Sequence, residues 1–361
     1  MTDRLRRIRE ILKEKDLDGL MLTGGVSRFY ATGLKTSAGI ALFTPGENLF
    51  ITDFRYIEAA RTKLAGLFTV EQSSIERKAY AIVRDRLPRA RRIGIEADVL
   101  TLRSAEGWKK AFADAGNKSV KLISAEDGLR ALRAVKDGAE IAAMAEAQRI
   151  AEKALCEVLP LLRPGLTERA VCAELIYRLL RNGAEKVSFD PIVASGPNGS
   201  KPHAELTDRI LERGDFVTID FGCVYQGYCS DMTRTVAIGE ATGEMRAVYN
   251  IVLEAKAAGI AAAKAGVVGK EIDAAARKVI ADAGYGDLFG HGFGHGLGLE
   301  VHEPPNANPS EENPLPAGAV ISAEPGIYLP GRFGVRVEDV IVLTETGHIN
   351  LMNAPEELLV V

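Results

Sequence analysis

One arrangement of predicted helices occurs twice in the sequence, and this repeat constrains the fold more than any other feature. Gly165 and Gly183 have equivalents in Gly266 and Gly284, each 101 residues later. Apolar periodicity predicts a pair of helices around each pair of glycines, at 137–162 with 166–184 and at 249–266 with 269–286. A pair of predicted strands carrying acidic residues follows each helix pair. We therefore expect two related halves that form one shared site.

The length and the patterns along the chain predict two domains. At 361 residues the chain exceeds the usual size of a single hydrophobic core. Residues 1–130 alternate between helical and strand patterns, which predicts a small α/β domain. The long helical run begins near residue 136, so the second domain, of α+β class, is expected to span 136–361.

Composition excludes several classes of function. With 47% hydrophobic and 26% charged residues, the chain resembles a globular protein that folds in water. A formal net charge of -4 favours neither a nucleic-acid partner nor an acidic membrane. The N-terminus lacks the apolar core of a signal peptide, and no apolar run reaches membrane-spanning length. We predict a cytoplasmic protein with no nucleic-acid or membrane partner.

The first candidate site feature is a pair of aspartates in a predicted hairpin, DFVTIDFGCVYQGYCSDMTRTVAI. Asp220 and Asp231 lie at equal distances from the turn at YQG, so we expect them to face each other. Opposed side chains on one face of an antiparallel pair have Cβ atoms ~5 Å apart, and two carboxylates there repel unless a cation lies between them. Two surface charges are the alternative. Because Asp220 follows Val217 and Ile219 in an apolar strand, where an unpaired carboxylate is costly, we favour a cation site.

A second predicted hairpin, GAVISAEPGIYLPGRFGVRVEDVIVL, repeats this pattern with glutamates. Glu324 and Glu338 are symmetric about Gly331 in the turn PGR. Arg336 lies two residues from Glu338, hence on the same strand face. It could hold a carboxylate in place by paired hydrogen bonds, although an ordinary salt bridge fits equally well.

Histidines gather in and near the same segments. In GHGFGHGLGLEVHEPP, glycine occupies every even position from 290 to 298, which disfavours a helix. An extended strand would present His291 and His295 on one face and leave bare backbone opposite, with room for a substrate or a metal. His203 and His302 also lie in or near the acidic segments, so four of the five histidines accompany the acids.

The chemistry of these residues predicts a hydrolytic metal site. The zinc-protease motif HExxH is absent, because His302-Glu303 is followed by two prolines. Four carboxylates and one imidazole suit Mn(II) or Co(II), with Zn(II) or Fe(II) as alternatives, and four negative ligands balance two divalent ions. Two metal ions ~3.5 to 4 Å apart can share a water, lower its pKa and stabilise the oxyanion that its attack creates.

The ligand order Asp, Asp, His, Glu, Glu resembles that of the metallopeptidase family containing methionine aminopeptidases, aminopeptidase P and prolidase. The resemblance rests on IDFGCVYQGYCSDMTRT, GHGFGHGLGLEVHEPP, SAEPGIY and RVED, and covers residues from about 136 to the end. It implies a pita-bread catalytic domain with pseudo-twofold halves. The N-terminal domain resembles the creatinase-type domain that the proline-specific members possess. An Xaa-Pro peptidase, acting on short peptides with proline in second position, is therefore expected.

The resemblance also implies roles for individual residues. Asp220 would chelate one metal ion, Asp231 and Glu338 would bridge both, and His295 and Glu324 would complete the other. Glu324 would also carry a proton to the leaving nitrogen.

Further residues are expected to contact the substrate. His302 would bind the scissile carbonyl oxygen, while His203 and His291 would line the substrate site beside Arg336. Because a proline nitrogen is tertiary and its ring needs an apolar pocket, Phe189, Phe293 and Tyr328 are candidates for that pocket, although each is equally a candidate for the core. Family members are commonly dimers, so we expect a homodimer.

Three rival interpretations stay open. Within the peptidases, the sequence does not separate an Xaa-Pro aminopeptidase, which we favour, from a dipeptidase restricted to Xaa-Pro. A metal-free, creatinase-like amidinohydrolase and a non-catalytic binding module both exist on this fold. These two would be expected to lack ligand residues, and here none is replaced.

Overall fold

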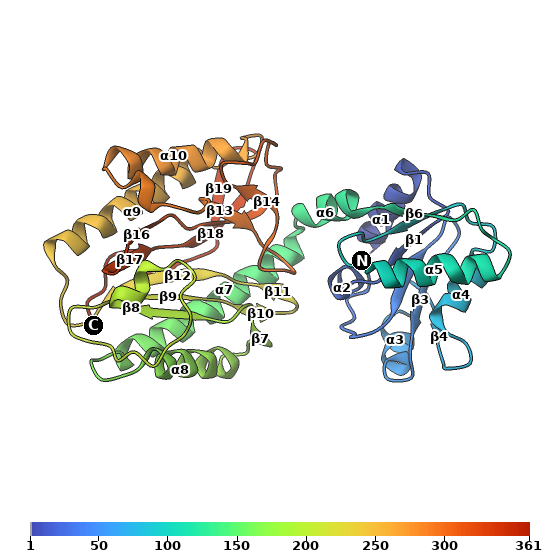
Figure 1. The fold of residues 1–361 in the computed structure, drawn as a ribbon, viewed down its shortest axis with the longest axis horizontal. Coiled ribbons are helices and arrows are strands. Elements are labelled where there is room, and N and C mark those ends of the chain that lie inside the picture. The colour runs from blue at the N-terminus through green and yellow to red at the C-terminus, as the bar shows by residue number, and fades with distance from the viewer. Residues whose placement is uncertain (1) are drawn as a thin grey trace. The chain divides into compact units, whose positions relative to one another are not determined.

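The computed structural model describes residues 2–361 of the chain. The chain divides into two compact units, Met1–Leu132 and Arg133–Val361. Figure 1 traces both units from the N-terminus in blue to the C-terminus in red. Within the described residues, no helix combines the length and the apolar character needed to cross a membrane.

The N-terminal unit is a six-stranded mixed sheet with helices packed on it. The strand order is β4-β3-β2-β1-β5-β6, with antiparallel pairing in β3-β2-β1 and parallel pairing elsewhere. Its elements are α1 (Thr2–Glu14), β1 (Gly19–Leu22), α2 (Gly25–Thr32), β2 (Ile40–Phe43), β3 (Asn48–Thr52), α3 (Ile57–Lys63), β4 (Thr69–Gln72), α4 (Ala79–Arg86), β5 (Arg92–Ile95), α5 (Leu102–Asp114), β6 (Lys121–Ser124) and α6 (Glu126–Ala134). The predicted α/β character of this region is confirmed.

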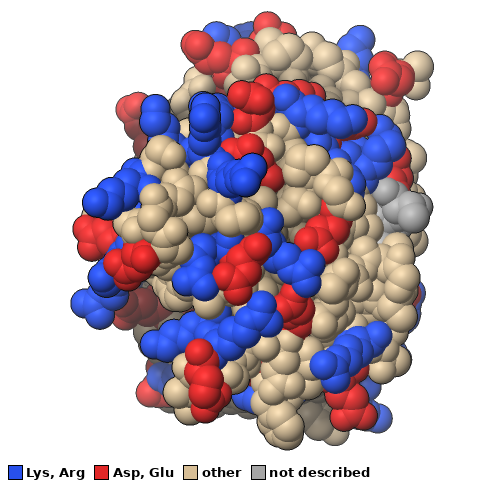
Figure 2. All heavy atoms as spheres, turned by 90° about the vertical axis from the view of Figure 1, so that its right-hand side faces the viewer, with Lys and Arg blue, Asp and Glu red and all other residues tan. Residues whose placement is uncertain are grey.

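The surface of the N-terminal unit carries both signs of charge. Figure 2 shows Lys and Arg side chains interspersed with Asp and Glu on the face turned to the viewer. Several pairs are within ion-pair distance, for example Arg86 with Glu47 at 3.1 Å and Arg84 with Asp85 at 2.7 Å. Such exposed pairs contribute little to stability, roughly 0–1 kcal/mol each.

The C-terminal unit contains both predicted helix pairs. Asp137 caps the first helix, where its side chain accepts from the backbone N–H groups of Ala139 and Glu140. The four helices are α7 (Gly138–Val158), α8 (Glu168–Arg181), α9 (Gly243–Ala262) and α10 (Gly269–Asp282). In Figure 1, the strands of this unit lie between α7 and α8 on one side and α9 and α10 on the other. Each helix pair covers its own hydrophobic core cluster.

The strands form two main antiparallel sheets, ordered β12-β9-β8 and β14-β13-β15-β18-β19. Shorter strands extend their hairpins in the orders β11-β10-β7 and β16-β17. The bounds are β7 (Lys186–Val187), β8 (Ile192–Ser195), β9 (Phe216–Phe221), β10 (Cys223–Tyr225), β11 (Tyr228–Cys229), β12 (Met232–Ala237), β13 (Gly294–Gly296), β14 (Glu303–Ala307), β15 (Val320–Ala323), β16 (Gly326–Leu329), β17 (Phe333–Arg336), β18 (Asp339–Leu343) and β19 (His348–Asn350). Helix pair and acidic hairpin alternate as the repeat predicts.

Candidate active site

The nine residues that the sequence singled out converge on one cavity of about 480 Å³ in the C-terminal unit. They come from β9, β13, β17 and the connections between strands. The residues lining the cavity from this set are Asp220, Asp231, His295, Glu324, Glu338, His203, His291, His302 and Arg336. Segments more than 130 residues apart along the chain therefore meet in a single site.

The register of the first hairpin differs from the prediction. Asp220 pairs with Thr233, not with Asp231, because the turn is centred between Gln226 and Gly227. Gln226 has a φ of 48° and Gly227 a φ of 87°, which makes the turn tight and moves the register by two residues. Asp231 stands just before β12, and the two carboxylates reach the cavity without being directly opposed.

The register of the second hairpin agrees with the prediction. Ala323 pairs with Asp339 in one ladder and Gly326 with Arg336 in the next, so Glu324 and Glu338 lie between them at matching positions. Both side chains line the cavity.

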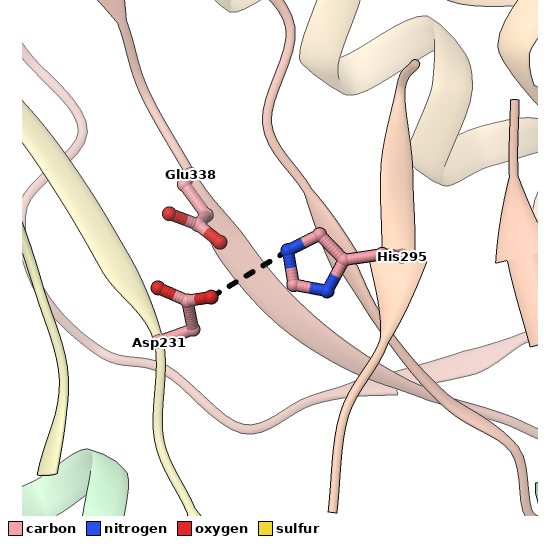
Figure 3. A group of neighbouring side chains, drawn as sticks. All are labelled: Asp231, His295 and Glu338. Atoms are coloured by element: carbon pink, nitrogen blue, oxygen red, sulfur yellow. Dashed lines mark ion pairs between the residues drawn. The ribbon is translucent and has the colours of Figure 1, made fainter. Parts of the chain in front are cut away.

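Three side chains form the tightest candidate metal group. Asp231, His295 and Glu338 each offer a ligand atom, and these atoms lie within 4.8 Å of one another. Figure 3 shows the two carboxylates and the imidazole pointing toward one another from different strands and connections, with His295 Nε2 3.6 Å from Asp231 Oδ2. Glu324 contacts the same ring nitrogen, with its Oε1 3.2 Å from Nε2 of His295.

Electrostatics within this group indicate a site built for cations. Burial raises the pKa of Asp231 well above its ordinary value, and the charge of Glu338 raises it further. Burial likewise raises the pKa of Glu338, together with the charge of Glu324. Burial also acts to raise the pKa of Glu324, but its hydrogen bond with His295 and the charge of that imidazole outweigh burial and bring the pKa to about 2.

The hydrogen bonding of the Glu338 carboxylate also fits a site for divalent ions. Glu338 Oε2 accepts a hydrogen bond from Thr233 Oγ1 at 2.8 Å, whereas its buried Oε1 has no hydrogen-bond partner among residues 2–361. A buried carboxylate oxygen without a donor is costly, and a cation beside it removes that cost. Clustered carboxylates with one imidazole are a donor set that divalent ions accept.

The glycine-rich run is extended over a shorter stretch than predicted. Its strand is Gly294–Gly296, whose glycines make room for neighbouring backbone, while Gly292 and Gly294 also line the cavity. A Cβ on Gly294 would lie 2.0 Å from the carbonyl oxygen of Ser322, and one on Gly296 would lie 2.2 Å from that of Glu303. Close approach of β13 to β14 and β15 therefore explains the glycines. His291 lies before this strand but still reaches the cavity.

A hydrogen-bond chain links the second hairpin to the first. Arg336 donates to Asp220 Oδ2 at 2.5 Å, to the hydroxyl of Tyr328 at 2.7 Å and to Thr233 Oγ1 at 3.2 Å. The Tyr328 hydroxyl also lies 2.8 Å from Nε2 of His291. Of the two predicted alternatives for Arg336, the structure shows a salt bridge through one nitrogen, and its carboxylate belongs to the other hairpin.

Of the three aromatic residues predicted for a proline pocket, only Phe189 lines the cavity. Phe293 is fully buried in the core and packs against Gly259, where an added Cβ would lie 2.3 Å from its ring. Tyr328 is held in the hydrogen-bond chain with Arg336. The cavity wall is otherwise apolar at Ile192 and Val301.

Sequence reasoning did not find several residues that hold the site together. Thr233 and Ser322 each bond a candidate ligand, Ser322 Oγ lying 3.1 Å from Glu324 Oε1 and accepting from the backbone N–H of His295 at 2.9 Å. Asn306 and Asn308 also line the cavity. The position of Thr233 opposite Asp220 was a usable signal, but only with the correct hairpin register.

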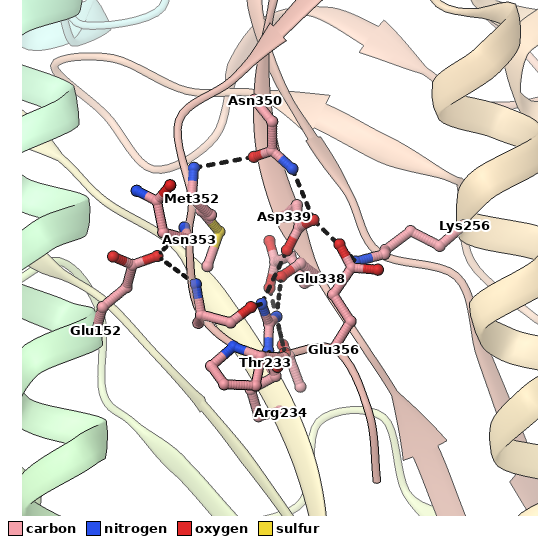
Figure 4. A network of polar contacts seen from close by, with 12 residues as sticks. Glu152, Thr233, Arg234, Lys256, Glu338, Asp339, Asn350, Met352, Asn353 and Glu356 are labelled. Carbon is pink, nitrogen blue, oxygen red and sulfur yellow. Dashed lines mark hydrogen bonds and ion pairs between the residues drawn. The ribbon is translucent and has the colours of Figure 1, made fainter.

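A buried ion network fixes the backbone behind Glu338 (Figure 4). Arg234 donates to the carbonyl oxygen of Glu338 at 2.5 Å and to Asp339 Oδ1 at 3.0 Å. Lys256 from α9 donates to Asp339 Oδ2 at 2.8 Å, and Asn350 donates to the same oxygen at 2.9 Å. The backbone at Glu338 and Asp339 is therefore held by Arg234 from one segment and by Lys256 and Asn350 from others.

With this geometry described, comparison with known proteins identifies the class. Residues 142–345 match metallopeptidase family M24, and residues 4–135 match the creatinase/prolidase N-terminal domain. The chain belongs to metallopeptidase family M24. It is a metallo-exopeptidase, and this family implies divalent metal ions as cofactors. The predicted pita-bread catalytic domain, which follows a creatinase-type N-terminal domain in the sequence, is confirmed.

Relatives resemble the chain over its whole length. The peptidase YqhT of Bacillus subtilis is 39% identical over 99% of this chain and 99% of its own. A solved Xaa-Pro dipeptidase from Bacillus anthracis has a TM-score of 0.94 at 38% identity and covers 100% of this chain and 99% of its own. A solved X-Pro aminopeptidase from Thermotoga maritima has a TM-score of 0.91 at 37% identity, covering 99% of this chain and 100% of its own.

Proposed function

We propose that this protein hydrolyses the Xaa-Pro bond at the N-terminus of short peptides with two divalent metal ions held by five side chains. The ligands would be Asp220, Asp231, His295, Glu324 and Glu338. The observation that carries the proposal is the convergence of these carboxylates and this imidazole on one cavity, where the buried Oε1 of Glu338 has no hydrogen-bond partner among the described residues. Similarity to an Xaa-Pro dipeptidase and to an X-Pro aminopeptidase supports the proline specificity.

Bound divalent ions would supply an activated water and would stabilise negative charge on the scissile carbonyl oxygen. Glu324 would move a proton from the water to the proline nitrogen, which is tertiary in the peptide and must be protonated to leave. His302, whose ring centroid lies 4.2 Å from that of His295, would donate a hydrogen bond to the carbonyl oxygen. His203 and His291 would orient the substrate, and Arg336 would hold Asp220 in place.

The proline ring would lie against the apolar part of the cavity wall. Phe189, Ile192 and Val301 line that wall and have no polar side-chain group to desolvate. We also propose manganese or cobalt as the metal, because oxygen-rich donor sets favour such ions, and a homodimer as the assembly.

A prolidase is the second candidate, supported by the similarity to the Xaa-Pro dipeptidase from Bacillus anthracis at 38% identity. The two candidates differ in whether the cavity admits residues beyond the proline.

Metal-stripped protein resupplied with Mn(II), Co(II) or Zn(II) should be tested on Ala-Pro and on Ala-Pro-Ala-Ala. Release of Ala from the longer peptide would show an aminopeptidase, and cleavage of the dipeptide alone would show a prolidase. Absence of metal-dependent cleavage of either peptide would overturn the proposed specificity. Calorimetric titration with Mn(II) separates failure to bind metal from failure to bind peptide, and light scattering reports the oligomeric state.

A further inference from the structure

Glu168, the first residue of α8, is fully buried and its carboxylate accepts hydrogen bonds from a single loop. Its Oε1 accepts from the backbone N–H of Ser195 at 2.7 Å and from Ser195 Oγ at 2.8 Å. The side-chain amide of Asn198 donates to the same oxygen at 3.1 Å. Its Oε2 accepts from Thr207 Oγ1 at 2.5 Å. The carboxylate thus has several neutral donors, as a buried charge requires.

These donors stand at the two ends of one segment. Ser195 precedes the loop 196–206, Asn198 lies near its start and Thr207 follows it, so Glu168 closes this loop at its base. The middle of this loop carries Pro202, His203 and Ala204, all of which line the cavity. Without such a closure, the loop would lose the restriction that holds His203 at the cavity wall. Substrate binding would then have to order the loop, and the lost conformational entropy would weaken peptide affinity.

The opposite side of the loop is held by the second hairpin. Arg336 donates to the carbonyl oxygen of Pro202 at 3.4 Å, and the backbone N–H of Gly331 donates to Ser200 Oγ at 3.2 Å. A Cβ on Gly334 would lie 2.0 Å from the carbonyl oxygen of Gly199, so the two backbones are in close contact. The loop therefore lies between α8 and the hairpin that carries Arg336, with Glu168 as its anchor on the helix side.

We propose that Glu168 is a positioning residue for peptide binding, which fixes the loop 196–206 so that His203 faces the substrate. This inference rests on the proposed function. Glu168 does not line the cavity and bonds none of the candidate metal ligands. Its loss should therefore raise KM for peptides and leave metal binding unchanged.

The test uses Glu168→Gln, which keeps size but turns an amide N–H₂ toward groups that donate. Thr207→Val removes the tie at the far end of the loop while keeping its shape. Asp208→Asn is the matched control, since Asp208 lies next to this loop, is 75% exposed and pairs with Arg169 on the surface.

We expect Glu168→Gln and Thr207→Val to raise KM for the cleaved proline peptide about 10-fold, the equivalent of one well-formed hydrogen bond to a charged group. Mn(II) affinity from calorimetry should stay at the wild-type value, and the backbone amides of residues 199–201 and 203–206 should exchange hydrogen faster. The control should match wild type in all three measurements. If Glu168→Gln does not fold, Thr207→Val decides the question.

An unchanged KM in a folded variant, or a parallel fall in Mn(II) affinity, would overturn the inference. Failure of the proposed function gives a different result: the wild-type protein would not cleave proline peptides with any of the metals. That result would overturn both the proposed function and the role of Glu168.

Discussion

The two halves of the catalytic unit, 138–237 and 243–343, share a backbone plan but hold their site segments with different side chains. In both, a glycine with positive φ follows the first helix and its N–H bonds a leucine carbonyl, Gly165 to Leu211 and Gly266 to Leu315. The glycines after the second helices, Gly183 and Gly284, also have positive φ, at 108° and 86°. The repeat is thus preserved where the backbone needs a conformation that only glycine adopts easily.

The difference lies in what the second helix of each pair binds. In the first half, Glu168 of α8 takes neutral donors from the loop that carries His203. In the second half, Asp273 of α10 pairs with Arg277 at 2.8 Å and accepts from the backbone N–H of Phe293, and Arg277 donates to the carbonyl oxygen of His291. The same architectural task is performed by a hydrogen-bonded carboxylate in one half and by an ion pair in the other.

The largest expected effect tests whether both halves serve one site. Asp231→Asn removes an anion in the first half and Glu338→Gln removes one in the second, and we expect either to abolish turnover and weaken Mn(II) binding, because each lowers the charge that holds the cations. Peptide hydrolysis and calorimetry measure the two effects. The exposed Asp208→Asn variant should retain both. Full activity in either ligand variant would contradict a shared site.

A steric prediction addresses the second half alone. In Gly294→Ala the new Cβ would lie 2.0 Å from the carbonyl oxygen of Ser322, so β13 must move away from β15 and carry His295 with it. We expect a loss of about 3 kcal/mol in the free energy of unfolding, the upper end of ordinary overpacking, measured by urea denaturation. Gly290→Ala is the control from the same glycine run, because nothing lies within 4 Å of its added Cβ. Equal stabilities would show that β13 is not tightly packed.

Neutralising the carboxylate of the ion pair in the second half should lower the free energy of unfolding more than neutralising the hydrogen-bonded carboxylate of the first half. We expect Asp273→Asn to lower the free energy of unfolding by about 1.5–3 kcal/mol, since it weakens charge-assisted bonds to Arg277. Asp282→Asn, on the exposed face of the same helix, should change stability by no more than about 1 kcal/mol. A larger loss in Glu168→Gln than in Asp273→Asn would reverse the comparison.

The smallest effect probes what the halves share. Gly165→Ala and Gly266→Ala should each lower the free energy of unfolding by about 1–2 kcal/mol, because alanine is strained at the positive φ values of 95° and 83° while its Cβ meets no neighbour. Gly243→Ala, at the start of α9 and also without a neighbour, should be neutral or stabilising. Clearly unequal losses of unfolding free energy at Gly165 and Gly266 would show that the two equivalent glycines do not contribute equally to stability.

Much of the site could be predicted from the sequence because its residues lie in local patterns. The symmetric placement of Glu324 and Glu338 about a turn depends only on hairpin geometry, and their register is as expected. The same argument misplaced Asp231 relative to Asp220, since the tight turn at Gln226 and Gly227 shifts the register by two residues. Turn type is decided by φ values that the letters YQG do not specify.

The two-domain plan, the repeated helix pairs and the choice of the acids and histidines as site residues could be read from the sequence, because these depend on spacing within short stretches. What those residues contact depends on the folded chain: Gly294 and Gly296 admit neighbouring strands, Phe293 belongs to the core, and Glu168 anchors the His203 loop. These contacts join segments that are distant in sequence, and a pattern along the chain carries no information about which distant group fills the space beside it.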